Sequence, residues 1–145
     1  MEDLRTKSRR LYAQHHLGLL LLDYVQLAHT YRPLNKRYQE IGRITRLLKQ
    51  LALELDIPIV AASQLGRDAA LRRPTLGDLR ESGNQEQDAD IVLFLYPPNG
   101  TAQATPLVKT EFILAKHRQG QTGAFCMALH KEKLDFVPLT TGGAR

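Results

Sequence analysis

The clearest regular pattern of apolar positions lies in residues 35–56. Apolar side chains there recur at steps of three and four residues, which is the spacing of one buried stripe along a helix. The stripe consists of Ile41, Ile44, Leu48, Leu51 and Leu55. Pro33 lies shortly before the stripe and Pro58 shortly after it, and prolines commonly mark the limits of a helix. We therefore predict a long amphipathic helix over residues 35–56.

Two short apolar runs flank this helix, residues 17–22 before it and residues 57–62 after it. Uninterrupted apolar runs of this length are typical of strands buried on both faces, as in parallel sheets covered by helices. Strand, helix and strand in succession predict a right-handed crossover between two parallel strands. Both strands would then end at the same edge of the sheet, where Asp23 follows the first strand and Gln64 follows the second.

The remaining pattern predicts one more helix and several strands. Residues 4–15 have the composition of a basic helix with a solvated face. Residues 66–78 have no periodicity, and we expect a basic loop there. Further strands are expected at residues 90–96, 108–116, 124–130 and 134–137, with a glycine-containing hairpin turn at 117–123. We interpret residues 1–139 as one domain and residues 140–145 as a flexible tail.

Composition narrows the class of protein. The 145 residues are 43% hydrophobic and 24% charged, which suits one soluble domain with an apolar core. The net charge of +5 favours a polyanionic partner, either nucleic acid or nucleotide phosphate, although many basic proteins bind neither. The longest apolar run is too short to span a membrane and the N-terminus does not resemble a signal peptide, so we expect a cytoplasmic protein. The single cysteine, Cys126, excludes an internal disulfide.

Two polar residues at the ends of the predicted strands suggest nucleotide chemistry. Four leucines followed by Asp23 have the form of a Walker B element, because one carboxylate at a rigid strand end can hold Mg²⁺ beside a nucleotide. The amide of Gln64 is suited to bonding a γ-phosphate oxygen or an attacking water. Taken alone, each residue is more often a simple cap of a turn, so these two positions by themselves leave the function open.

Two further segments carry cations that allow both a functional and a structural interpretation. In the polar stretch 78–90, Arg80 and the backbone N–H groups near Gly83 would suit a phosphate, although a solvated helix is the simpler interpretation. Lys116 and Arg118 flank the predicted hairpin turn and are expected on the same side of the ribbon. They would suit insertion into a neighbouring subunit's nucleotide site, as arginine fingers do, or the protection of an edge strand by positive charge.

Taken together, these segments resemble one family, the DnaB-type replicative DNA helicases. Residues 20–27 (LLLDYVQL) resemble its Walker B strand, and residues 63–67 (SQLGR) resemble its third motif. Residues 78–90 resemble its most distinctive stretch, and residues 116–120 (KHRQG) resemble the hairpin motif that carries an arginine finger. The resemblance implies an α/β fold: a partial RecA-like (P-loop NTPase) domain, with a mostly parallel central sheet flanked by helices and a C-terminal antiparallel hairpin.

The resemblance also implies a function. It implies a homo-hexameric ring that hydrolyses ATP with Mg²⁺ between subunits, moves 5′–3′ along single-stranded DNA, and works with a primase and a helicase loader. For ATP, it implies that Asp23 positions Mg²⁺ through water, that Gln64 senses the γ-phosphate, and that Lys116 and Arg118 act on the next subunit's nucleotide. For DNA, it implies contacts to the backbone from Arg67, Arg80, Glu81 and Gly83.

Three departures from the family pattern stand out. His117 and Gln119 replace residues that are usually Gln and Asn, and Asn84-Gln85 replace a small residue and Ile. No G-x-x-x-x-G-K-[ST] loop occurs in the chain, so we expect the isolated chain to be inactive. Without the strand and the helix that flank this loop in the family, we expect a sheet with an exposed edge that favours association. The alternative is a non-enzymatic RecA-like module that binds DNA or assists ring assembly.

Overall fold

The computed structural model describes residues 1–31, 36–66, 69, 72–80, 85–98, 100 and 105–139, and only the backbone of Arg80. The chain forms two compact units. The first unit comprises Met1–Gly66 and Gly77–Ala89, and the second unit comprises Arg67–Leu76 and Asp90–Arg145. No helix in the described ranges has the length and apolar character needed to cross a membrane.

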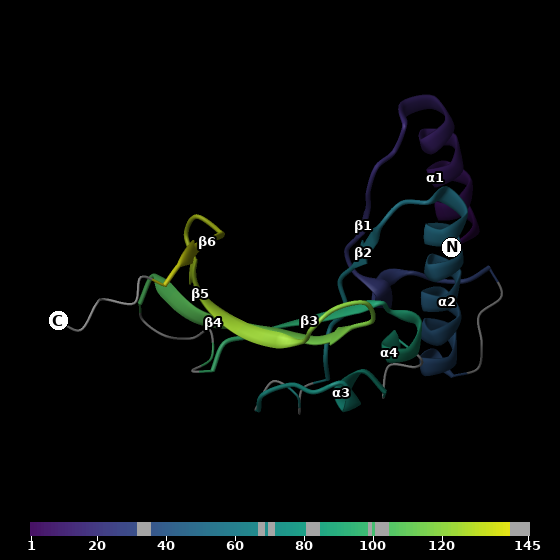
Figure 1. The fold of residues 1–145 in the computed structure, drawn as a ribbon. Coiled ribbons are helices and arrows are strands. Elements are labelled where there is room, and N and C mark those ends of the chain that lie inside the picture. The colour runs from purple at the N-terminus through teal and green to yellow at the C-terminus, as the bar shows by residue number, and fades with distance from the viewer. Residues whose placement is uncertain are drawn as a thin grey trace. The chain divides into compact units, whose positions relative to one another are not determined.

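Figure 1 shows the elements of both units. The first unit contains α1 (Glu2–His15), β1 (Leu20–Leu22), the short 3-10 helix η1 (Val25–Leu27), α2 (Arg37–Leu55), β2 (Ile59–Ala61), α3 (Gly77–Arg80) and α4 (Gln85–Asp88). The second unit contains β3 (Ile91–Tyr96), β4 (Leu107–His117), β5 (Gly123–His130) and β6 (Asp135–Pro138). The two predicted helices and all six predicted strands are therefore present, with shifted limits.

Helix α2 provides most of the core of the first unit. All five residues of its predicted apolar stripe are at most 6% exposed, which confirms the periodicity. Ile41, Ile44 and Leu48 pack with Val25 of η1, whereas Leu51 and Leu55 pack with Ile57, which follows the helix. The helix ends at Asp56, which adopts a left-handed conformation with φ 51°. Residue 35, where we predicted the helix to begin, lies outside the described residues.

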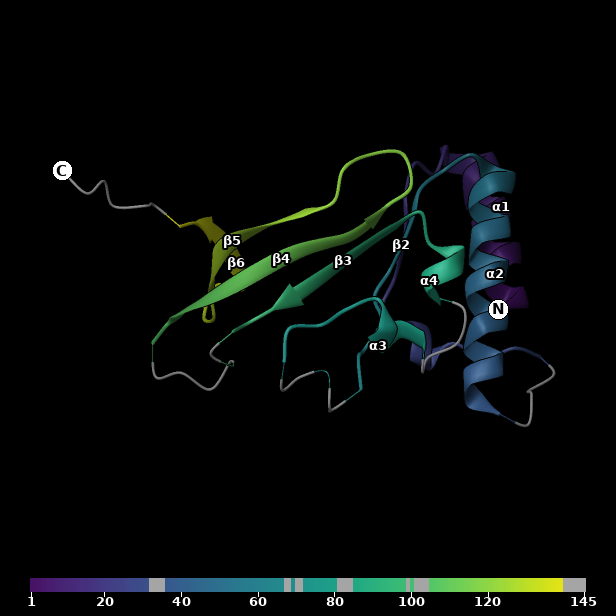
Figure 2. The ribbon, with the colours of Figure 1, turned by 60° about the horizontal axis from the view of Figure 1, so that its bottom comes forward.

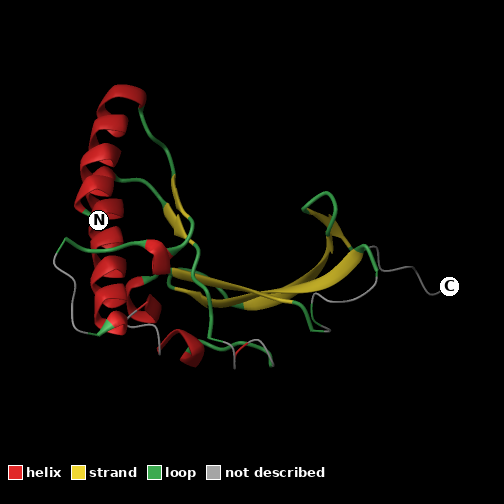
Figure 3. Ribbon diagram, turned by 180° about the vertical axis from the view of Figure 1, so that it is seen from behind, coloured by secondary structure: helices red, strands yellow, loops and turns green. Residues whose placement is uncertain are grey.

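Ion pairs join α1 to α2, the two long helices drawn in red in Figure 3. Arg9 Nε donates to Glu54 Oε1 at 2.5 Å, and Arg5 Nη2 donates to Glu54 Oε2 at 3.2 Å. The hydrogen bond from Arg9 is the main reason that the pKa of Glu54 falls to about 2. The basic residues of α1 are thus partly used within the fold.

Strands β1 and β2 pair in parallel, with Leu20 opposite Ile59 and Leu22 opposite Ala61. The predicted strand, helix and strand are confirmed. The prediction that both strands are buried on both faces is wrong, because Leu21 is 67% exposed and its partner Val60 is 57% exposed. Leu20, Leu22 and Ile59 pack against the core on α2, and in the described structure α2 covers only that face of the strand pair.

Strands β3 to β6 form one antiparallel sheet in chain order. Strands β3, β4 and β5 run side by side as long ribbons in Figure 2. The antiparallel part is larger than the single hairpin we predicted, and parallel pairing in the described residues is limited to β1 and β2. Short turns between β4 and β5 and between β5 and β6 account for the antiparallel pairing of these three strands, because such turns join only antiparallel neighbours.

Candidate functional site

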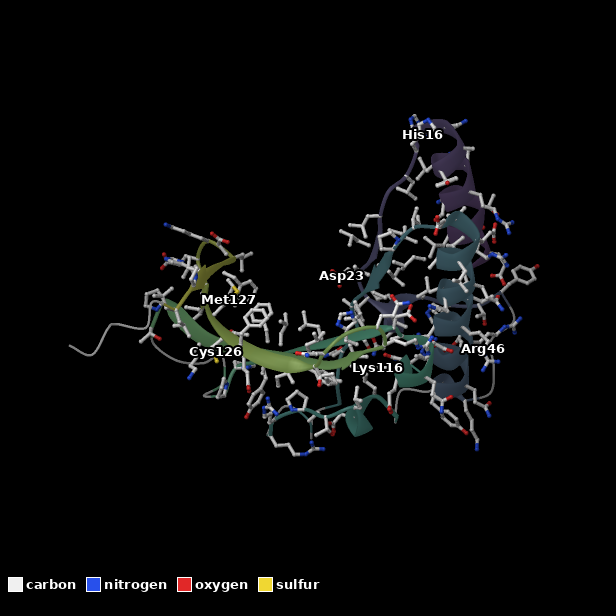
Figure 4. The ribbon with its side chains drawn as sticks, viewed as in Figure 1. His16, Asp23, Arg46, Lys116, Cys126 and Met127 are labelled. Atoms are coloured by element: carbon white, nitrogen blue, oxygen red, sulfur yellow. The ribbon has the colours of Figure 1, made fainter. Side chains whose placement is uncertain are left out.

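The carboxyl ends of β1 and β2 bring the first pair of predicted site residues to one end of the strand pair. Asp23 directly follows β1, where Figure 4 labels its exposed side chain. The strand pairing continues beyond it, because the Ala62 N–H donates to the Leu22 carbonyl and the Val25 N–H donates to the Ala62 carbonyl, both at 2.9 Å. Val25 is only 2% exposed, so a buried anchor follows Asp23 two residues later. The Asp23–Tyr24 peptide bond is cis.

Gln26 fixes the segment that follows β2. Its Nε2 donates to the Gln64 carbonyl at 2.9 Å and to Ser63 Oγ at 3.0 Å. Its Oε1 accepts the Gln64 N–H at 3.2 Å. The backbone of Gln64 is therefore held at both its donor and its acceptor, while the Gln64 residue as a whole is exposed to solvent. In the sequence Gln26 stands out only as part of the segment that resembles a Walker B strand, and no local pattern indicates this contact.

Gln26 is in turn supported by an ion pair at the start of α2. Arg37 Nη2 donates to the carbonyl of Gln26 at 2.6 Å and to that of Ala28 at 3.0 Å. Arg37 also pairs with Glu40, whose residue is 3% exposed. The Thr30 N–H donates to Glu40 Oε1 at 3.0 Å, and this bond, followed by the contact with Arg37, lowers the pKa of Glu40. The segment after β1 is thus fastened to the first turn of α2.

The sequence does contain a signal that Glu40 is buried and paired. Glu40 immediately precedes Ile41 and lies four residues before Ile44, so a carboxylate occupies the edge of the apolar stripe. On a helix, residues four apart share one face, and a charged residue on a buried face needs a partner. Arg37, three residues before Glu40, is that partner.

The second pair of predicted site residues lies where β4 ends. Lys116, labelled in Figure 4, pairs with Val92 of β3. Arg118 follows β4 and is held by Asp90, whose carbonyl accepts the Arg118 N–H at 2.9 Å and whose Oδ1 lies 3.1 Å from Arg118 Nη1. Both side chains are about half exposed, at 53% and 48%. The turn folds closely over His117, since a Cβ on Gly120 would lie 2.3 Å from His117 Cε1.

The predicted DNA-binding residues are only partly described. Arg67, Glu81 and Gly83 lie outside the described residues, and Arg80 contributes only its backbone, at the end of α3. Another cation of the predicted basic loop is anchored within the second unit. Arg73 donates to Glu111 from Nε at 3.0 Å and from Nη2 at 2.8 Å, and the hydrogen bond from Arg73 lowers the pKa of Glu111.

The predicted α/β fold of the RecA-like class is confirmed by its likeness to solved structures. The structure aligns with a solved ATPase domain at a TM-score of 0.81 and 38% identity, covering 94% of this chain and 50% of that chain. It also aligns with a DnaB-like replicative helicase, solved to study its interactions with primase, at a TM-score of 0.77 and 36% identity, covering 92% of this chain and 33% of that one.

The sequence itself identifies the family. Residues 1–138 match the DnaB-like helicase C terminal domain, and the chain belongs to that family. It is 42% identical to the replicative DNA helicase DnaB of Geobacillus stearothermophilus and 42% identical to the replicative DNA helicase DnaC of Bacillus subtilis. Each alignment covers 96% of this chain and 32% of the relative, so the chain spans about a third of the length of these relatives.

Proposed function

We propose that this chain is the C-terminal part of the motor domain of a replicative DNA helicase, which couples ATP hydrolysis to 5′–3′ movement along single-stranded DNA and to unwinding of the duplex. The observation that carries the proposal is the family match over residues 1–138. The arrangement of Asp23 and Gln64 at one end of a parallel strand pair supports it, because ligands of open α/β sheets bind at the carboxyl ends of the strands.

In this proposal the residues divide the work on ATP between two subunits of a homo-hexamer. Asp23 holds Mg²⁺ through water, which suits a single exposed carboxylate because Mg²⁺ retains several of its waters in protein sites. Bound MgATP supplies the phosphoryl group that is transferred to water. Gln64 senses the γ-phosphate in its own subunit, and Lys116 and Arg118 stabilise charge on the nucleotide of the neighbouring subunit.

Contacts to DNA form the second part of the proposal. Arg67, Arg80, Glu81 and Gly83 bind the phosphate backbone, and a grip on phosphates suits a motor that must ignore base sequence. The net charge of +5 supports a polyanionic partner. A primase and a helicase loader are the proposed protein partners. Because its 145 residues contain no G-x-x-x-x-G-K-[ST] loop, the isolated polypeptide is expected to be inactive.

A hybrid helicase tests this proposal. Residues 1–138 replace the matching segment of the Geobacillus stearothermophilus relative, which then supplies the remainder of the motor. We expect DNA-stimulated ATP hydrolysis and unwinding, both abolished by Asp23→Asn. In the same hybrid, Arg80→Ala should reduce the slope of log affinity against log salt by about 1. An assembled hybrid that binds DNA without hydrolysing ATP would overturn the motor assignment and favour a non-enzymatic module.

A further inference from the structure

We propose that Gln26 is a positioning residue that fixes Gln64 relative to Asp23 and thereby sets the rate of ATP hydrolysis. The inference rests on the function proposed above, since it gives Gln64 its partner within the same site. Gln26 lies on the segment after β1 and Gln64 on the segment after β2, and 38 residues of sequence separate them. One side chain therefore connects the ends of the two strands that carry the proposed Mg²⁺ and γ-phosphate contacts.

The side-chain amide of Gln26 extends the hydrogen bonding between the two segments beyond the last backbone pair. Backbone hydrogen bonds join Leu22 and Val25 to Ala62, and there the chain turns into η1, whose backbone bonds run within the turn. A primary amide carries a donor and an acceptor, as a peptide group does. The Gln26 amide uses both toward the backbone of Gln64, at 2.9 and 3.2 Å, and so takes the place of the next backbone pair.

This contact requires glutamine. A glutamate would present two acceptors, and one of them would face the Gln64 carbonyl, which is also an acceptor. A leucine of similar size would leave the Gln64 N–H and carbonyl without this partner. A hydrogen bond to Ser63 Oγ, at 3.0 Å, adds a third contact from the same Nε2. The amide therefore matches the segment after β2 in a way that neither the charged nor the apolar substitute reproduces.

Gln26 is itself held in place. Its carbonyl accepts from Arg37 at 2.6 Å, and Arg37 is paired with the buried Glu40. The preceding residue, Val25, is buried in the core against α2. Because α2 holds Gln26 in this way, the position of α2 helps to determine the position of Gln64. Gln64 itself is exposed and is not held by burial. Preorganisation of this kind is what a residue that contacts a reacting phosphate needs.

The first experiment uses the 145-residue chain and tests the contact without any nucleotide. Amide hydrogen exchange of Gln64 is compared in the wild type, in Gln26→Glu and in Gln26→Leu. We expect both variants to accelerate exchange about fivefold or more, as for the loss of one ordinary hydrogen bond. Glu54→Gln is the matched control, because it removes the carboxylate that pairs with Arg5 and Arg9 of α1 in the same unit and should leave the exchange of Gln64 unchanged.

The second experiment measures ATP hydrolysis in the hybrid helicase. We expect Gln26→Glu and Gln26→Leu to lower kcat by about tenfold to a hundredfold with little change in KM, because small misplacements of a catalytic group carry costs of this size. Ser63→Ala removes only one of the three contacts and should have a smaller effect in the same direction. Glu54→Gln should retain the wild-type kcat, which separates positioning from a general loss of stability.

The outcomes distinguish the inference from the function on which it rests. A wild-type hybrid without ATPase activity contradicts the proposed function, and in that case the exchange of Gln64 still tests the contact. An active hybrid in which both Gln26 variants keep the wild-type kcat overturns the inference, and so does an unchanged exchange rate. Equal losses of kcat in the Gln26 variants and in Glu54→Gln would also overturn it, since they would indicate a purely structural effect.

Discussion

The two units hold their proposed catalytic residues in different ways. In the first unit, Gln64 is fixed through its backbone by Gln26, which is supported by an ion pair between Arg37 and Glu40, whose side chains are 38% and 5% exposed. In the second unit, Arg118 is held by Asp90, and both side chains are about half exposed. Loss of the hydrogen bonds to a charged, largely buried carboxylate costs about 1–3 kcal/mol, whereas an exposed ion pair contributes about 0–1 kcal/mol.

The difference fits the roles proposed for the two residues. Gln64 would act on a nucleotide within its own subunit, where a fixed position is an advantage. Arg118 would act on a neighbouring subunit, so it must leave one carboxylate and meet another anion during each cycle. A weak, solvated pair permits that exchange at little cost, and a buried pair would oppose it.

The largest effect is expected from Arg118→Ala in the hybrid helicase. An arginine finger contributes about 10³–10⁵ in rate, so we expect kcat to fall by at least about 10³-fold. The folding of the chain should be little affected, because the ion pair of Arg118 with Asp90 is half exposed. Steady-state ATPase assays measure the first effect and urea unfolding the second.

Lys133→Ala is the control for this prediction, since Lys133 is an exposed cation in the turn between β5 and β6 of the same sheet. It should retain wild-type activity. An Arg118→Ala hybrid that keeps more than about a tenth of the wild-type rate would be incompatible with a finger of the usual strength. The exposed pairing of Arg118 could then no longer be explained by a role on the neighbouring subunit's nucleotide.

A large effect on stability is expected from Ile44→Ala in the first unit. Ile44 is 0% exposed, and truncation of such a side chain costs about 2–5 kcal/mol in the free energy of unfolding. Leu21→Thr is the matched comparison on β1, because Leu21 is 67% exposed and threonine retains a preference for strands. That variant should lie within about 0.5 kcal/mol of the wild type. Urea unfolding that gave equal losses would show that the open face of β1 is covered in solution.

The apolar pattern predicted which side chains are buried more completely in helix α2 than in the strands. The stripe on α2 identified every one of its buried apolar residues, because a helix has one periodic face and burial follows that period. In β3, Val92 and Phe94 are buried, while Leu93 and Leu95, equally apolar, are about half exposed. An apolar run therefore locates a strand, but the number of covered faces depends on segments elsewhere in the chain.

The sequence predicted which positions form the candidate site, but it did not predict the contacts between them. Asp23 and Gln64 follow from the ends of two strands, which local sequence marks clearly. The bond from Gln26 to Gln64 joins residues 38 apart, and only the register of β1 against β2 creates it. The pairing of Asp90 with Arg118 likewise depends on the register of β3 against β4. No local pattern encodes either register, so these partners became visible only in the folded chain.

Acid should weaken the first unit through Glu40. Its pKa is lowered from 4.5, first by the Thr30 N–H and then by Arg37. A lowered pKa means that the stabilisation is complete above about pH 4.5 and is lost as the pH falls through the pKa of the folded state. Glu54, with a pKa of about 2, extends the loss to lower pH. We expect urea unfolding to show a steady loss of stability from about pH 5 toward about pH 2.

Glu40→Gln isolates the contribution of this residue. At neutral pH it should cost about 1–3 kcal/mol, because the bonds from Arg37 and Thr30 lose their charged acceptor. At a pH below the pKa of folded Glu40 the wild type is protonated too, so the difference between the two proteins should shrink. The same cost at neutral pH and in strong acid would mean that the charge of Glu40 is irrelevant, and the pair of Arg37 with Glu40 would no longer distinguish the first unit.

The smallest effect is expected from Asp90→Asn, which removes the charge that faces Arg118. The backbone bond from the Arg118 N–H to the Asp90 carbonyl remains, and the lost ion pair is half exposed, so the free energy of unfolding should change by less than about 1 kcal/mol. Urea unfolding in low salt and in about 1 M salt measures it, and the small difference should disappear in high salt, where the Debye length is about 3 Å. A loss above about 2 kcal/mol that persists in high salt would show that Asp90 holds Arg118 firmly. An arginine held that firmly would be poorly suited to exchange between Asp90 and a neighbouring nucleotide, and the contrast with Gln64 would then fail.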